Sequence, residues 1–380
     1  MVSQYFGAKE REKLSLTVGN CITLAAIASA VTTVIGLLLT TPMLRMLDTP
    51  ESILSWSAGY LHIIFWGVAG GAFYNILSGI LRGLGDSVSA LLFLLVATGL
   101  NIALDIWFVA GFRMGVAGVA LATVLAQGIS AVLCLLKLLR MQDVFDLTWD
   151  SLRLRRDSAL RIVRIGVPSG ITQAIMSVAM LVVQSLTNSM GEAVIACNVI
   201  IMRVDGFAMM PNMSFGQAMS VYAGQNVGAG KVDRVLQGRR QGMVISVGFS
   251  CAITACLLLF GKTMFGLFTD TGELIELAYR MMSIMAAGYI AVAVSQVLGG
   301  IMRGAGDTVT PMWISMITTI VLRVPTAYIL AWYTRCEAWP SGRPEALSCS
   351  LLVSWVLGAV FSAIAYRKGK WRRYVTEAAQ

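Results

Sequence analysis

The chain has 380 residues, of which 57% are hydrophobic and only 13% are charged, and its mean hydropathy is +0.75. Because about a quarter of the residues in a soluble domain are charged, this composition excludes an ordinary soluble protein and indicates an integral membrane protein. The net charge of +9 is compatible with a nucleic-acid partner only if the basic residues form a patch, and their distribution along the chain argues against that.

Ten apolar stretches are long enough to cross roughly 30 Å of hydrocarbon as helices. They cover residues 14–39, 53–77, 88–109, 116–139, 165–186, 193–223, 243–268, 274–298, 311–332 and 347–365. Long continuous apolar runs predict helices, since a membrane barrel is built from short alternating strands. We therefore predict an all-α integral membrane protein with ten transmembrane helices.

The Lys and Arg residues fall mainly on one side of these spans. Of the 29, the connections on alternate sides hold 21 and five, and Arg203, Arg280 and Arg323 lie within or at the edge of spans. By the positive-inside rule, we expect both termini in the cytoplasm. The basic residues thus indicate topology, and we expect no nucleic-acid partner.

One phrase occurs twice in the chain. Gly79-Ile80-Leu81-Arg82-Gly83-Leu84-Gly85-Asp86 returns as Gly300-Ile301-Met302-Arg303-Gly304-Ala305-Gly306-Asp307, and Gln4 and Gln225 begin a second pair of matching segments with the same offset in the numbering. A shared register over two separate segments predicts a duplicated unit, a common construction among transporters.

The register also sets the expected domain boundaries. Residues 165–224 precede Gln225 in the second half, and the first half has no equivalent before Gln4. We therefore expect a twelve-helix, two-lobed parent of which this chain lacks the first two helices. The expected parts are an N-lobe over 1–140, with four complete helices and the stub of a preceding one, a cytoplasmic linker over 141–164, a six-helix C-lobe over 165–366 and a basic cytoplasmic tail over 367–380.

Each copy of the repeated phrase lies where a span ends on the basic side. Its Gly-x-Gly spacing permits a tight turn, its Arg is placed to cap the last carbonyls of one helix, and its Asp is placed to cap the start of the next. We interpret both copies as structural elbows, formed by Arg82, Gly83, Gly85 and Asp86 and by Arg303, Gly304, Gly306 and Asp307. A dinucleotide-binding loop would need a preceding strand, and helices are predicted here.

Three polar residues in the first half are candidates for binding a coupling cation. Asn101 and Asp105 are four residues apart in the third span and share one helical face, and Thr123 lies on the next span. A carboxylate inside a membrane helix is a candidate for ion or proton handling, and these oxygens suit either Na⁺ or a proton. The alternative is that Asp105 lies near enough to the outer end to meet interfacial water. We predict no other metal site and no cofactor.

Two spans at the start of the second half, residues 165–186 and 193–223, carry polar and methionine side chains at helical spacings. The candidate cavity residues are Gln173, Met176, Met180, Gln184, Asp205 and Met209. Methionine suits a surface that accepts varied apolar ligands, although it is also ordinary filler in a membrane helix. Pro211 and Pro325 are expected to bend their spans.

Other chemistry is poorly represented in the sequence. His62 is the sole histidine, which excludes a histidine-based metal centre or triad, and we predict that the protein is not an enzyme. The seven cysteines lack metal spacing and are interpreted as packing thiols, with pairing of Cys336 and Cys349 left as an alternative.

Five segments together resemble the MATE (multidrug and toxic compound extrusion) family. They are Ser3-Gln4-Tyr5-Phe6-Gly7-Ala8-Lys9, the elbow that begins at Gly79, Asn101-Ile102-Ala103-Leu104-Asp105, Gly115-Val116-Ala117-Gly118-Val119-Ala120-Leu121-Ala122-Thr123, and Gly224-Gln225-Asn226-Val227-Gly228-Ala229-Gly230. The resemblance implies a twelve-helix, two-lobed antiporter that exports organic cations and drugs in exchange for H⁺ or Na⁺ by alternating access. It also implies a cation site to which Asn101, Asp105 and Thr123 correspond, together with an Asp on a first helix that has no counterpart here.

We therefore predict a multi-pass, MATE-like helical bundle of the bacterial cell (inner) membrane. It works as a cation-coupled antiporter, binds small amphiphilic organic cations, contacts membrane lipid and is monomeric. One alternative is a lipid-linked oligosaccharide flippase, which would need several cations lining its cavity, where this chain offers chiefly Arg203 and Arg323. Another is a remnant that inserts without transporting. An intramembrane enzyme acting on lipids would need an acid–base or nucleophile constellation, and the sequence contains none.

Overall fold

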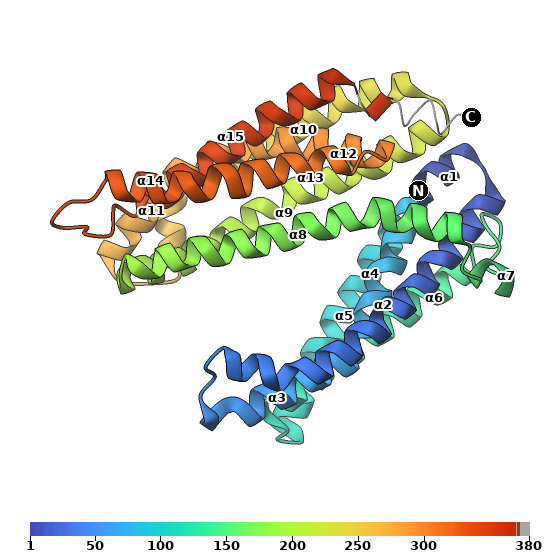
Figure 1. The fold of residues 1–380 in the computed structure, drawn as a ribbon, viewed down its shortest axis with the longest axis horizontal. Helices are drawn as coiled ribbons and strands as arrows, with labels where there is room; N and C mark the ends of the chain where they lie inside the picture. The colour runs from blue at the N-terminus through green and yellow to red at the C-terminus, as the bar shows by residue number, and fades with distance from the viewer. Residues whose placement is uncertain (370, 373–380) are drawn as a thin grey trace. The chain divides into compact units, whose positions relative to one another are not determined.

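The computed structural model describes residues 1–369, 371 and 372, and the described chain is almost entirely helical. It divides into two compact units, Met1–Ile162 and Val163–Gln380, drawn in Figure 1 as the blue-to-green and the green-to-red parts of the ribbon. The division falls inside helix α8, so a continuous helix runs from one unit into the next. Residues 370 and 373–380 of the predicted basic tail lie outside the described residues.

The first unit contains seven α-helices and one π-helical turn among its described residues, followed by the beginning of α8. They are α1 (Val2–Ala8), α2 (Arg11–Met46), α3 (Glu51–Trp66), α4 (Val68–Gly83), α5 (Ser87–Ile106), the π-helical η1 (Trp107–Gly111), α6 (Gly115–Leu139) and the short α7 (Trp149–Leu152). Its core gathers Leu14, Val18, Leu81, Cys134 and Leu138, from α2, α4 and α6.

The second unit is built from longer helices. They are α8 (Arg156–Ser189), α9 (Glu192–Gly228), α10 (Val232–Gly266), α11 (Gly272–Ala286), α12 (Gly288–Ala305), α13 (Val309–Met316), the π-helical η2 (Ile317–Arg323), α14 (Val324–Tyr333) and α15 (Glu345–Lys368). The predicted bend at Pro325 therefore coincides with a π-helical stretch that ends two residues before the proline. A π-helical stretch shifts the register of the backbone hydrogen bonds and often marks a functional site.

The predicted spans correspond to these helices. Within the described residues, eight helical segments are long and apolar enough to cross a membrane, or ten if two bent helix pairs are each one span. The bent pairs are α3 with α4, at 45°, and α11 with α12, at 42°. The ten predicted segments overlap these ten elements, and the bends were not predicted because the apolar character continues across each break.

The two units repeat the same order of helices in the predicted register. The offset that relates Gly79 to Gly300 also relates Arg11 to Val232, the first residues of α2 and α10, and Glu51 to Gly272, the first residues of α3 and α11. Helix α1 corresponds in this register to the last turn of α9. Only the final pair departs clearly from it, since α15 begins later relative to α6. The predicted duplication is therefore present in the backbone.

The two elbows have nearly identical geometry. Gly85 and Gly306 have φ of 94° and 103°, a left-handed conformation that glycine adopts without strain. The Asp86 carboxylate accepts a hydrogen bond from the Ser89 amide at 3.0 Å, and Asp307 accepts one from the Thr310 amide at 3.0 Å. Both aspartates thus lie at the start of the next helix, as predicted.

The predicted role of the two elbow arginines was wrong. Arg82 donates to the Ser78 hydroxyl at 3.4 Å, and Arg303 donates to the Gln296 amide oxygen at 3.5 Å. Both side chains therefore extend back along their own helices toward these polar side chains rather than toward the final carbonyls. Within the described residues, the ends of α4 and α12 are closed by backbone bonds, from Asp86 to Leu81 and from Asp307 to Met302, each 2.9 Å long.

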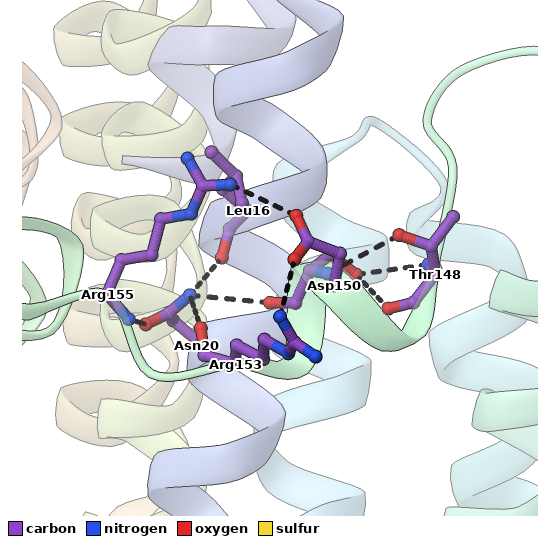
Figure 2. Close-up of polar contacts among 7 residues, drawn as sticks. Leu16, Asn20, Thr148, Asp150, Arg153 and Arg155 are labelled. Carbon is purple, nitrogen blue, oxygen red and sulfur yellow. Dashed lines mark hydrogen bonds and ion pairs between the residues drawn. The ribbon is translucent and has the colours of Figure 1, made fainter.

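The segment after α6 is bound to α2, as Figure 2 shows. The buried Asn20 donates to the carbonyl oxygens of Ser151 and Arg153, at 3.4 and 3.3 Å, and accepts from the Arg155 amide at 3.0 Å. Asp150 lies within 3.7 Å of Arg153 and 3.0 Å of Arg155. The predicted linker 141–164 is thus largely part of the first unit, and α8 begins inside it at Arg156.

Candidate functional site

The candidate cation site lies between α5 and α6 of the first unit. Asn101 donates through Nδ2 to the Thr123 hydroxyl at 3.4 Å, and that hydroxyl donates to the Val119 carbonyl at 3.0 Å. The Thr123 oxygen therefore keeps one lone pair, and the Asn101 carbonyl oxygen stays available as an acceptor. The structure thus brings two of the three predicted residues into direct contact.

Asp105 lies one turn beyond Asn101 and two residues before the π-helical η1. Its Oδ1 atom is buried and has no hydrogen-bond partner among the described residues. A buried carboxylate oxygen without a donor is costly unless it is protonated or meets a cation. This atom argues against the alternative in which Asp105 is satisfied by interfacial water alone.

The donor set of this site suits a monovalent ion better than a transition metal. It offers one carboxylate, one amide and one hydroxyl, and no group of three or more His, Cys, Asp or Glu side chains able to hold a metal occurs in the described part of the chain. Oxygen ligands of this kind bind hard cations, and a desolvated carboxyl group binds a proton.

A second candidate site is a cavity of about 330 Å³ inside the second unit. All six predicted cavity residues line it: Gln173, Met176, Met180 and Gln184 from α8, and Asp205 and Met209 from α9. We term this the methionine cavity, because Met202, Met281 and Met285 line it as well. Its other walls include Leu351 and Trp355 of α15. More than half of the lining residues are apolar, and the rest are polar or charged, a mixture found in many small-molecule sites.

Asp205 is held in this cavity by a residue that the sequence reasoning missed. The Tyr289 hydroxyl, at the start of α12, donates to Asp205 Oδ1 at 2.7 Å. Tyr289 is fully buried, and its ring packs against Trp355 with the ring centroids 5.5 Å apart. The aromatic packing fixes the hydroxyl and the hydroxyl fixes the carboxylate, so Asp205 presents a defined orientation to the cavity.

A second cavity of about 170 Å³ adjoins the methionine cavity, sharing Met176, Met209, Arg323, Leu351 and Trp355 with it. We term it the arginine cavity, because Arg303 and Arg323 both line it. The sequence singled out Arg303 only as part of an elbow. Arg203, also noted in the sequence, is exposed, and it is absent from the described linings of both cavities.

The cysteines do not contribute a crosslink. All seven are free, including Cys336 and Cys349, whose pairing was left open. Cys134 and Cys197 are buried, as the interpretation of packing thiols requires, whereas Cys251 and Cys256 are exposed on the surface of α10 and do not fit it.

Comparison with known proteins identifies relatives across nearly the whole chain. A family model described as MatE matches residues 1–107 and 168–329. The chain is 30% identical over 364 residues to "Probable multidrug resistance protein YoeA" of Bacillus subtilis, covering 93% of this chain and 78% of that protein. It is 24% identical to "Probable multidrug resistance protein NorM" of Thermotoga maritima, covering 98% of this chain and 80% of that protein.

A solved structure, "Crystal structure of MATE in the bent conformation", matches with a TM-score of 0.90 and 22% identity, covering 100% of this chain and 83% of that one. This likeness shows a shared fold. The segments matched by the family model contain Asn101, Asp105 and the six predicted cavity residues, whereas Thr123 lies outside them.

Proposed function

Because the chain belongs to the MatE family, we propose that it is a cation-coupled antiporter that exports amphiphilic organic cations and drugs across the cell membrane. The names of its relatives support the substrate class, since both proteins named above are called multidrug resistance proteins. A lipid-linked oligosaccharide flippase has less support, because neither relative named above is called a flippase and, of the two arginines considered for it, only Arg323 lines a described cavity.

The methionine cavity accommodates the organic substrate in this proposal. Flexible, polarisable methionine side chains adapt to apolar bodies of different shape. Asp205 supplies a negative charge to the wall, and Arg323, which also borders the arginine cavity, is the other charged group among the described lining residues. The Tyr289 hydrogen bond orients that carboxylate. A small amphiphilic cation meets both requirements.

The observation that carries the coupling role is the buried Oδ1 atom of Asp105, which has no partner among the described residues. Binding of H⁺ or Na⁺ neutralises this carboxylate, and the oxygens of Asn101 and Thr123 are available to a sodium ion. The ion and the substrate exchange if each binds one conformation of the transporter more tightly than the other. No further cofactor enters the proposal.

The proposed orientation places both termini and the basic connections in the cytoplasm of the cell membrane, following the positive-inside rule. Reporter fusions at residue 380 and after Arg113, on the side poor in basic residues, test this. The proposal expects a cytoplasmic reporter to be active only at residue 380. Activity only after Arg113 would reverse the orientation.

Ethidium efflux from proteoliposomes tests the coupling role, with a pH gradient and a Na⁺ gradient imposed separately. We expect Asp105→Asn to lower coupled efflux at least tenfold, since loss of a coupling free energy of about 1.4 kcal/mol corresponds to that factor. Asp270→Asn is the matched control, because Asp270 is exposed after α10. Efflux by Asp105→Asn that equals the control under both gradients would refute the coupling role.

A further inference from the structure

The arginine cavity differs from the methionine cavity in its charge. Two guanidinium groups line it, and no Asp or Glu occurs among its described lining residues. Its other polar side chains are neutral, namely Ser295, Gln296, Ser315, Thr318, Thr319, Ser354 and Ser362. A cavity with fixed cations and no carboxylate attracts an anion.

Arg303 has most of its hydrogen-bonding capacity unused. Its side chain lies over Gly299, where an added Cβ would be 3.2 Å from Nη1, and its hydrogen bond within the described residues is the long one to Gln296, at 3.5 Å. A guanidinium has five N–H donors. In the first unit the residue equivalent to Gly299 is Ser78, which itself accepts a bond from Arg82, so the glycine leaves Arg303 open to the cavity.

Arg323 is in a similar state at the end of η2. Its Nε atom is buried and has no hydrogen-bond partner in the described structure. No ion pair involves Arg303 or Arg323 among the described residues. Asp205 is the carboxylate on the other side of Arg323, in the methionine cavity, and it is bonded to Tyr289.

The charges of the two adjoining cavities therefore do not cancel. Arg303 and Arg323 contribute two positive charges and Asp205 contributes one negative charge, so one positive charge is left over. Uncompensated charge held away from bulk water is expensive, and a monoanion in the arginine cavity would balance it. Because Arg323 lines both cavities, one ligand can extend from the methionine cavity into the arginine cavity.

We propose that the arginine cavity binds the anionic group, a carboxylate, sulfonate or phosphate monoester, of an amphiphile whose apolar body lies in the methionine cavity. Arg303 and Arg323 donate charge-assisted hydrogen bonds to that group. The inference goes beyond the proposed function, because it adds zwitterionic and acidic amphiphiles to the cations considered above, and it concerns binding alone.

Two dyes that share one cationic ring system, a rhodamine carboxylic acid and its methyl ester, isolate the contribution of the carboxylate. Binding to the purified full chain in neutral detergent is followed by fluorescence anisotropy. We expect Arg303→Gln and Arg323→Gln each to weaken binding of the acid about tenfold, the size of one lost charge-assisted hydrogen bond. Arg303→Gln should change binding of the ester less than about threefold, and Arg323→Gln, which removes a positive charge from the methionine cavity, should not weaken it. Arg343→Gln, in the exposed loop before α15, is the matched control and should alter neither.

Competition on the unmodified protein keeps the test independent of variant folding. We expect benzoate to displace the acid dye and to leave the ester bound. Displacement by phosphatidylglycerol in mixed micelles instead would support the anion site and identify a lipid headgroup as its source. Displacement by neither anion, or an equal loss of both dyes in the two arginine variants, would overturn the inference.

The result is separable from the coupling proposal. Measured without Na⁺ and at a pH where dye binding to the parent no longer depends on H⁺, Asp105→Asn should leave acid-dye binding within about twofold of the parent, since Asp105 does not line the arginine cavity. A transporter that binds the acid dye and fails to export ethidium would refute the proposed function and leave the anion site intact.

Discussion

Helix α5 of the first unit and the α13–η2–α14 span of the second occupy the same place in the repeat, yet they carry polar groups of opposite charge. In the repeat register, Arg323 corresponds to Ile102, the neighbour of Asn101 in α5. Helix α5 also carries Asp105, and the residue that corresponds to Asp105 in the second unit is the neutral Thr326. One span therefore presents acceptors for a cation and the other presents a donor for an anion.

The elbows of the two units are alike, whereas the equivalent spans carry different charged groups. Both keep a glycine with positive φ followed by an aspartate that caps the next helix. The requirements of the elbow are set by the backbone, which is the same in both units, whereas the polar groups facing a cavity have no such constraint. The two units therefore share these turns and differ in the charged groups that their spans carry.

The largest expected stability effect separates the glycines of the two elbows. A Cβ at Gly304 would lie 2.3 Å from the Ser220 carbonyl oxygen, whereas at Gly83 it would lie 3.1 Å from Cγ1 of Val2, a side-chain atom. We expect Gly304→Ala to cost about 3 kcal/mol and Gly83→Ala about 1 kcal/mol or less. Thermal unfolding in detergent measures both, with Gly248→Ala, which meets nothing within 4 Å, as the control. Equal losses at Gly83 and Gly304 would contradict the difference in packing.

A bond found only in the second unit gives the next largest effect. Tyr289→Phe removes the donor to Asp205, and a hydrogen bond to a charged group contributes about 1.5–3 kcal/mol. The equivalent residue in the first unit is Val68. We expect Tyr289→Phe to lower the melting temperature and to weaken binding of the rhodamine ester. Tyr328→Phe is the control and should do neither, because the hydrogen bond from the Tyr328 hydroxyl to the Val182 carbonyl oxygen is long, at 3.4 Å. Unchanged binding of the ester by Tyr289→Phe would contradict a role of the Tyr289 hydrogen bond in orienting Asp205 for the ligand.

The two capping aspartates, Asp86 and Asp307, should contribute similarly to the free energy of unfolding at neutral pH. We expect Asp86→Ala and Asp307→Ala each to cost about 1 kcal/mol. Partial burial alone would raise the pKa of the Asp86 carboxyl, but bonds from Ser89 and the Lys137 charge outweigh it, so this pKa is lowered.

A lowered carboxyl pKa fixes the sign of the pH effect. The stabilisation by ionised Asp86 is fully present above the unfolded-state pKa of about 3.9 and is lost as the pH falls through the lower folded-state pKa. Melting temperatures measured from neutral pH to below about pH 3 should therefore show the parent and Asp86→Ala converging. A constant difference would contradict the contribution of the ionised carboxylate.

The smallest effect concerns a left-handed residue before α2 and its equivalent before α10. Lys9 has φ of 58° and Gly230 has φ of 70°, and a residue with a Cβ loses about 1 kcal/mol in this conformation. We expect Lys9→Gly to raise stability by somewhat less than about 1 kcal/mol and Gly230→Ala to lower it by about the same amount. Lys9→Ala removes the charge but keeps a Cβ in the left-handed conformation. A rise in stability in Lys9→Ala would therefore show that the gain in Lys9→Gly comes from loss of the charge.

The repeat and the cavity face of α8 could be predicted because both are local patterns. Glycines and aspartates that recur in one register demand the same turns, and Gln173, Met176, Met180 and Gln184 share one helical face. Tyr289 could not be assigned from the sequence, because its partner Asp205 is 84 residues away and meets it only through packing of α9 and α12. The role of Arg303 was misjudged for a related reason: Gln296 and the open space over Gly299 direct the side chain along α12, and neither effect is visible in the sequence around the elbow.

The central claim is that the first unit binds the coupling ion and the second unit binds the organic ligand. The effect of the ion on the affinity for the ligand tests this claim most directly. The dissociation constant of the rhodamine ester is measured on purified protein while Na⁺ and, separately, H⁺ are varied, for the parent and for Asp105→Asn. The account predicts that one of these ions weakens dye binding at least about fivefold in the parent, the usual scale of coupling between sites, and that Asp105→Asn binds the dye without this dependence. Dye affinity that ignores both ions in the parent, or an ion dependence that survives in Asp105→Asn, would contradict it.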